Sequence, residues 1–222
     1  KKAPPSNANH LLLGAYSEDP FVLRLAAALE AGEVTAQSRV LQSEAAPVSL
    51  RIRPPHPTAE RGTVCADVLD LKVEKSQHAQ LQMSWAESET SHALQVSWTR
   101  IHVSHGASLH LVLDAAAHSD GDRLVRLEVI LEEGAHLSAV SLHGGARHSQ
   151  FQAVVRCQGA DSSWTWKAGS RMNESRFVEL QIRGDHPVPR TQSRLDSYMI
   201  LGDQSRGVFR GSLSISPEGV KT

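Results

Sequence analysis

The sequence contains few aromatic residues, few cysteines and no long apolar run. Of its 222 residues, 5% are aromatic and two are cysteines, Cys65 and Cys157. Two cysteines cannot form a disulfide framework, and these two do not form a CxxC pair, so we expect a reducing compartment, the cytoplasm. The longest apolar stretch, residues 21–29, contains Arg24 and is far shorter than the roughly 20 residues that a membrane span needs. We therefore expect no contact with a membrane. The chain opens on Lys1 without an initiator Met or a signal peptide, as a processed chain or a fragment would.

The charges of the chain nearly cancel. Lysine and arginine total 23, aspartate and glutamate total 24, and the net charge is −1. Such a balance supplies no strong field for holding a nucleic acid or an anionic membrane surface. The 40% hydrophobic and 21% charged shares are those of a globular protein and exclude a disordered chain and a collagen-like fibre.

Helical periodicity occurs near the start of the chain. Ser17 to Pro20 form a typical helix start, and Gly32 is a natural stop. Apolar residues recur between them at helical spacing, which predicts a short helix over residues 19–31. We assign residues 1–33 to an N-terminal tail and helix. The apolar stripe of this helix is a packing face; a docking helix for a partner is the alternative.

From Val34 onwards apolar and polar residues alternate, which predicts β-strands to the end of the chain. Four alanines, Ala79, Ala107, Ala135 and Ala160, suggest an internal repeat with spacings of 28, 28 and 25 residues. Strands that recur at such a period are typical of a solenoid, in which each coil buries its apolar face against its neighbours. We expect an all-β domain over residues 34–222 that forms a parallel β-helix. A β-sandwich is the alternative.

The phase of the alternation predicts which side chains fill the core. Before the proposed turns, Ile101 and Val103 correspond to Val129 and Leu131, and then to Val155 and Cys157. After the turns, three further apolar sets alternate in the same way: Leu81, Met83 and Trp85; Leu109, Leu111 and Leu113; Trp164 and Trp166. All of these residues are expected to point inward.

The last 38 residues carry a gapless set of motifs. Residues Asp185 to Ser193 read D-H-x-x-P-x-x-x-S, residues 206–211 read R-G-V-F-x-G, and the chain ends on Lys221-Thr222. This set resembles the SufB/SufD family, in its SufD-type form, of iron–sulfur cluster assembly scaffold proteins. Thr191 departs from the family pattern, because members often carry Cys in the segment after the proline. The segment Arg176 to Leu180 replaces a more polar strand.

The resemblance implies a right-handed parallel β-helix, a cytoplasmic location and a scaffold role without catalysis. It also implies two partners, a SufB-like β-helix subunit and a SufC-like ABC ATPase; a homodimer is the alternative. We expect no cofactor on this chain itself, and an iron–sulfur cluster only at the level of the complex. The sequence contains no G-x-x-x-x-G-K-[ST] phosphate loop, so any ATPase activity would belong to a partner. Family members continue past the position of Thr222 into further strands and a C-terminal helical segment, which bears the ATPase contact and the later Cys and His residues associated with cluster assembly.

Four residues are candidate metal or sulfur sites. Cys157 offers the soft sulfur that iron prefers, but its phase favours a buried apolar role. His102 and His110 flank one turn and could face each other as a metal-binding pair; two solvated histidines are the alternative. His186 lies within the D-H-x-x-P motif, where it either fixes a loop through hydrogen bonds or takes part in chemistry.

Two hypotheses of another class remain. Many β-helices are carbohydrate-active enzymes, which need a carboxylate pair and exposed aromatic residues. The sequence shows no convincing carboxylate pair, and Trp164 and Trp166 alternate as core residues would. The other hypothesis is a diverged β-helix that serves as an interaction protein.

Overall fold

A computed structural model describes residues 34–41, 48–52, 64–85 and 94–220. The helix expected at residues 19–31, and with it the proposed tail of residues 1–33, lies outside the described residues. The described residues contain no helix, and therefore none that could span a membrane. They form the strands β1 (Val34–Leu41), β2 (Val48–Ile52), β3 (Val64–Val73), β4 (His78–Trp85), β5 (Leu94–Val103), β6 (Ser108–Ala115), β7 (Ser119–Leu131), β8 (His136–Gly144), β9 (Ala146–Cys157), β10 (Ser163–Met172), β11 (Phe177–His186), β12 (Gln192–Leu201) and β13 (Arg206–Ile215).

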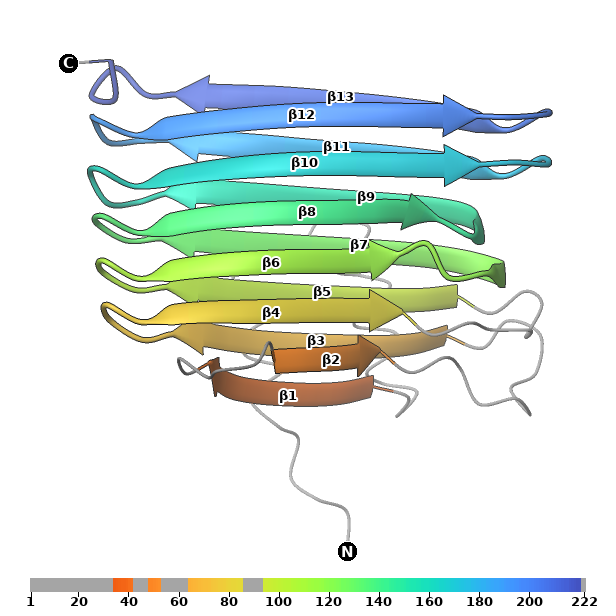
Figure 1. Cartoon of the computed structure of the whole chain (residues 1–222), viewed down its shortest axis with the longest axis horizontal. Helices are drawn as coiled ribbons and strands as arrows, with labels where there is room; N and C mark the ends of the chain where they lie inside the picture. Colours follow the sequence, from red (N-terminus) through yellow and green to blue (C-terminus); the bar gives the residue numbers. More distant parts are fainter. Residues whose placement is uncertain (1–33, 42–47, 53–63, 86–93, 221–222) are drawn as a thin grey trace, which may run out of the picture.

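The strands form two parallel sheets that share one core. The odd-numbered strands make sheet A, in the order β1-β3-β5-β7-β9-β11-β13, and the even-numbered strands make sheet B, in the order β2-β4-β6-β8-β10-β12. Figure 1 shows sheet B in front with its strands running to the right, sheet A behind running to the left, and the coils rising from β1 to β13. This path is right-handed, so the expectation of a right-handed parallel β-helix is confirmed.

The repeating unit differs from the one predicted from the alanines. Ser108 pairs with His136, so Ala107 and Ala135 do correspond, but Ala79 pairs with Leu109 rather than with Ala107. His136 pairs with Ser163, which likewise places Ala160 out of register with Ala135. The predicted spacings of 28 and 25 residues for these two coils were therefore wrong.

The feature that does recur is a left-handed residue in each described turn from sheet A to sheet B, from the β3–β4 turn to the β11–β12 turn. Gly106 and Gly134 hold this position with a φ of 65°, and Ser76, Asp161 and Arg190 hold it with φ values of 57°, 59° and 58°. Glycine adopts this conformation without strain, whereas other residues do so less readily. Because three different residue types replace the glycine, the register could not be found by matching letters.

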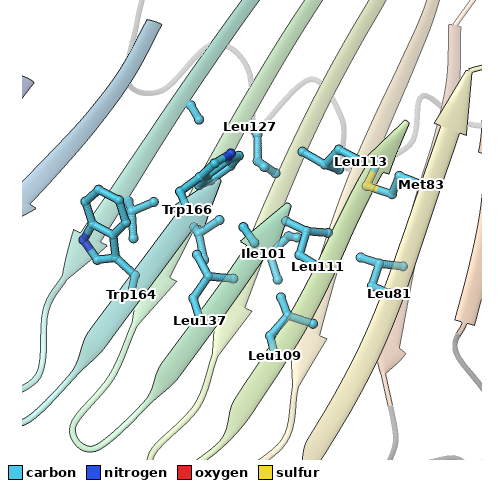
Figure 2. Close-up of a cluster of buried hydrophobic side chains, with 14 of the residues drawn as sticks. Leu81, Met83, Ile101, Leu109, Leu111, Leu113, Leu127, Leu137, Trp164 and Trp166 are labelled. Carbon is cyan, nitrogen blue, oxygen red and sulfur yellow. The ribbon is translucent and has the colours of Figure 1, made fainter. Parts of the chain in front are cut away.

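Alternating side chains fill the interior as the sequence predicted. All of the residues expected to point inward are at most 3% exposed. Figure 2 shows Trp166, Leu111 and Leu81 among this buried cluster. A large residue lies beside a small one where Trp166 pairs with Ala139. The Trp166 indole nitrogen also donates a hydrogen bond to the Ser141 hydroxyl at 2.9 Å. Such interdigitation gives a close-packed core.

Candidate functional site

The last described coil, β12 and β13, exposes side chains at positions that are buried in the preceding coils. Phe209 stacks on Leu180, yet Phe209 is 39% exposed whereas Leu180 is 0% exposed. Leu213 and Ile215, which also occupy interior positions, are each 57% exposed. β12 and β13 are edge strands as well, each with one unpaired row of backbone groups among the described residues. An apolar surface beside two free strand edges is a template for pairing with another β-structure.

The R-G-V-F-x-G motif shapes this coil through its glycines. Gly207 and Gly211 lie on the interior side of β13, in register with Val178 and Ile182. A Cβ at Gly211 would lie 3.2 Å from the Phe209 ring, so this glycine leaves the ring its space. The motif is thus part of strand β13, with Phe209 on the interior side of the strand.

His186 ends β11 on the interior side and is 6% exposed. Its Nδ1 lies 2.8 Å from Thr191 Oγ1, and its Nε2 lies 3.0 Å from Ser193 Oγ. The Thr191 hydroxyl donates a hydrogen bond to the Val188 carbonyl at 3.3 Å. The Thr191 oxygen can therefore accept a hydrogen bond from the Nδ1–H group of His186. The Ser193 hydroxyl then donates to Nε2. Both ring nitrogens are thus used within the D-H-x-x-P-x-x-x-S motif.

The electrostatics of His186 agree with this structural arrangement. Burial lowers the pKa of His186 below its usual value, although the neighbouring Asp185 carboxylate acts in the opposite direction. A neutral imidazole can donate with one nitrogen and accept with the other, as the geometry requires. The ring therefore links the end of β11 to the start of β12.

Two further contacts fix the turn between β11 and β12. Arg190 donates two hydrogen bonds of 2.8 Å to the Asp161 carboxylate in the preceding turn. The Ser216 hydroxyl donates to the Pro187 carbonyl at 2.8 Å. Sequence reasoning missed the Arg190–Asp161 pair, which becomes visible only when the two left-handed turn residues are placed in register.

Cys157 is fully buried at 0% exposure. Burial raises the pKa of its thiol, with a smaller opposing contribution from a hydrogen bond to Ser162. The thiol is therefore protonated at neutral pH and inaccessible to solvent, whereas metal binding and sulfur transfer need an accessible thiolate. Cys157 is thus a buried core residue, as the alternation of apolar residues in its strand predicted. The side chain of Cys65 lies outside the described residues.

The structure does not bring His102 and His110 together. His102 lies on the outer face of sheet A in β5, where its Nε2 is 2.9 Å from a Glu132 carboxylate oxygen. His110 is exposed on the outer face of sheet B in β6, between Gln80 and Ser138. Among the residues with described side chains, no three His, Cys, Asp or Glu residues gather as a metal site would require.

The outer face of sheet A carries a hollow of about 660 Å³. Its polar lining is largely self-paired, because the Asp122 carboxylate contacts Arg147 Nε at 3.0 Å and His148 Nδ1 at 3.1 Å. Although burial raises it, the pKa of Asp122 is lowered overall by Arg147 and His148. Phe177 and Leu124 supply apolar lining. The hollow therefore presents balanced charges, with Asp122 and Glu179 offset by Arg176 and Arg206.

The structure also positions the residues on which a carbohydrate-active site would depend. Trp164 and Trp166 are 1% and 0% exposed, so neither offers a surface on which a sugar ring could stack. Both tryptophans are core residues, as their alternation in the sequence predicted.

Comparison with known proteins identifies one family. The family model described as "SUF system FeS cluster assembly, SufBD core domain" matches residues 57–222, which include the candidate motifs and most of the solenoid. No curated protein matches the chain.

Proposed function

Because this chain belongs to the SufBD core-domain family of the SUF iron–sulfur cluster assembly system, we propose that it is a non-catalytic scaffold subunit of a SUF assembly complex. It pairs with a SufB-like β-helix subunit, and a SufC-like ABC ATPase supplies the nucleotide chemistry. The family membership does not distinguish SufB from SufD, and the SufD-type assignment rests on the terminal motifs. We place this complex in the cytoplasm.

The observation that carries the scaffold proposal is the match of the SufBD core-domain model to residues 57–222; the apolar side chains of the last described coil suggest where a partner would bind. Phe209, Leu213 and Ile215 lie on the core side of β13 and are 39–57% exposed. Burying apolar side chains of this size stabilises an interface by about 1.5–3 kcal/mol each when the burial is complete. A second β-helix can cover this surface and pair with the free edges of β12 and β13 at the same time.

In this proposal the cluster is cargo held at the level of the complex. Within the described part of the chain, Cys157 is buried and protonated, and His186 uses both ring nitrogens in its own turn. Neither residue is available as a ligand in this arrangement. In this proposal the ligands for iron and sulfur lie at the assembled interface or on partner subunits, and neither Cys157 nor His186 is among them.

The proposal is tested by co-expressing the chain with SufB-like and SufC-like subunits and purifying it anaerobically through a tag. The Leu213→Asp variant places a charge on the exposed end of the core, and we expect it to reduce recovery of the β-helix partner at least tenfold. Gln82→Asp, on the exposed outer face of β4, is the matched control and should leave recovery unchanged. Equal recovery with both variants would exclude the last coil as the interface, and no recovery with the unmodified chain would overturn the scaffold role.

A further inference from the structure

We propose that the outer face of sheet B carries a docking socket, centred on Gly169, for an acidic segment of a partner protein that inserts one apolar side chain. The socket consists of Leu142, Lys167, Gly169, Arg171 and Tyr198. It lies on the face opposite to the core and is separate from the end of the solenoid. The inference stands whether or not the last coil pairs with another subunit.

The register of sheet B creates the shape of this socket. Gly169 in β10 pairs with Leu142 in β8 on one side and with Tyr198 in β12 on the other. All three positions point away from the core, on the face that Figure 1 presents to the viewer. Neighbouring strands lie about 4.8 Å apart, so the Cα atoms of Leu142 and Tyr198 stand roughly 10 Å apart. The end of the Leu142 side chain leans towards Gly169, to 3.2 Å from where a Cβ would lie, whereas no Tyr198 atom lies within 4 Å of that point. The result is a notch with two apolar walls and a backbone floor.

The walls of the notch are unusually exposed for apolar residues. Tyr198 is 68% exposed and Leu142 is 52% exposed. Val140 and Ile200, which adjoin them on β8 and β12, are 36% and 66% exposed. A contiguous apolar patch with a charged rim is typical of an interaction site, whereas single exposed apolar residues are not.

The fold itself does not require a glycine at the centre of this patch. Gly169 has no positive φ. A Cβ there would lie 3.2 Å from the flexible end of Leu142, which would shift by a few tenths of an ångström, and 3.8 Å from the Ser141 carbonyl oxygen. By contrast, a Cβ at Gly184 would lie 2.6 Å from Trp164, and one at Gly144 would lie 2.6 Å from the Arg171 carbonyl. Glycine weakens a strand and often marks a place where another molecule approaches the backbone. At position 169, packing gives no reason for it, whereas a docked side chain would.

The charges around the notch select an acidic occupant. Lys167 and Arg171 flank Gly169 on the same strand and the same face. Neither cation has an ion pair with any residue that the structure describes. Asp196 on β12 lies beside Lys167, and its ion pair is with Arg194 at 3.1 Å, so the patch carries three cations and one carboxylate. Two unpaired cations about 13 Å apart, on either side of an apolar notch, complement an apolar side chain with a carboxylate on each side of it. Such complementarity gives both specificity and faster association.

A second copy of this chain fits the socket less well than an acidic segment. In a symmetric dimer the same patch faces itself, so Lys167 and Arg171 would approach the same two cations of the other copy. Like charges brought together in this way oppose association. The occupant is therefore a segment of a different protein that carries the opposite charge.

The test uses a library of displayed 12-residue peptides, selected on the immobilised full chain. We expect the selected peptides to share an apolar or aromatic residue flanked by Asp or Glu. A selected peptide should bind at least tenfold more weakly to Gly169→Val, which fills the notch, and to the double variant Lys167→Glu with Arg171→Glu. Thr165→Val, on the same strand and the same face, is the matched control and should bind the peptide as the unmodified chain does.

Each other outcome overturns the proposal. These outcomes are no enrichment, selected peptides without acidic residues, and binding that neither socket variant alters. Sedimentation of the chain alone tests the competing occupant, because self-association that is lost in Gly169→Val would assign the patch to a dimer. Circular dichroism melts of the variants show whether they fold, and the double charge variant keeps the test decisive if Gly169→Val does not.

Discussion

At the scale of single residues, the interior of the solenoid contains a small polar region in addition to its apolar columns. His143 lies inside, 1% exposed, with its ring 4.4 Å from the Phe151 ring. Neither of its ring nitrogens has a hydrogen-bond partner within the described part of the protein. Arg123 is also buried and donates to the Gln95 side chain at 3.2 Å and to the Ala115 carbonyl at 2.7 Å.

This environment makes folding sensitive to acid at His143. Burial, with a contribution from the Arg123 charge, lowers the pKa of His143 to about 3, from an ordinary value of 6.5. As pH falls, the unfolded chain therefore takes up the proton first, and stability that is complete above pH 6.5 is lost progressively towards pH 3. We expect the titration of His143 to lower the free energy of unfolding by about 2 kcal/mol between pH 7 and pH 5.

Denaturant unfolding of the unmodified chain and of His143→Leu at both pH values measures this contribution. Leucine has a similar volume and carries no ionisable group, so the variant should lose about 2 kcal/mol less on acidification. His186 is present in both chains, and its own titration cancels in the comparison. Equal losses in the two chains would show that His143 is not buried as a neutral ring.

A second prediction concerns His186 and separates a structural role from a ligand role. His186→Ala removes the ring that joins Thr191 to Ser193 and leaves both hydroxyls without it. We expect the free energy of unfolding to fall by about 1–3 kcal/mol. The affinity of the chain for Fe²⁺ or Zn²⁺, measured by titration calorimetry, should not change. Loss of metal binding without loss of stability would mean that His186 is a ligand.

At the scale of the strands, two glycines on opposite faces of their strands should respond differently to alanine. At Gly184, on the core side of β11, a Cβ would meet Trp164 at 2.6 Å and Leu213 at 2.8 Å. We expect Gly184→Ala to destabilise the protein by about 1–3 kcal/mol, because the packed indole cannot move away without strain. Gly169→Ala, on the outer face, should be within about 0.5 kcal/mol of the unmodified chain. Thermal and denaturant unfolding compare the two, and equal effects would contradict the assigned inward and outward faces.

The strands also show what the sequence could and could not predict. Alternation correctly identified inward residues such as Ile101, Leu111 and Trp166, because side chains in a strand alternate faces and an apolar face must be buried. The register of the coils was predicted less well, since Ser76, Asp161 and Arg190 replace glycine at the left-handed turn position. Turn geometry is conserved between coils while the residue letters are not.

At the scale of the whole molecule, the solenoid differs at its last described coil from the coils beneath it. The resemblance of the terminal motifs predicted the family, which the match over residues 57–222 shows. It could not predict that Leu213 and Ile215 are largely exposed, because their apolar alternation is the same as that of a buried strand. Exposure depends on what stacks above a strand, and alternation within one strand does not report this.

The exposed end leads to a prediction about the isolated chain. Apolar core positions that face solvent beside free strand edges promote association with other β-structures. We expect a polypeptide of residues 1–222 alone to self-associate as its concentration rises, and Leu213→Asp to shift this association to at least fivefold higher concentration. Analytical ultracentrifugation measures the shift. Gln82→Asp is the control, and equal association of both variants would contradict the assignment of this surface.

The central claim is that this chain is a scaffold subunit of a SUF assembly complex. The most direct measurement is anaerobic affinity purification of the tagged protein from its own cells at native abundance, followed by native mass spectrometry of the intact assembly. We predict a complex that contains this protein, a second β-helix subunit and an ABC ATPase. Recovery of the protein as a monomer or as a homodimer, without the ATPase, would contradict the account.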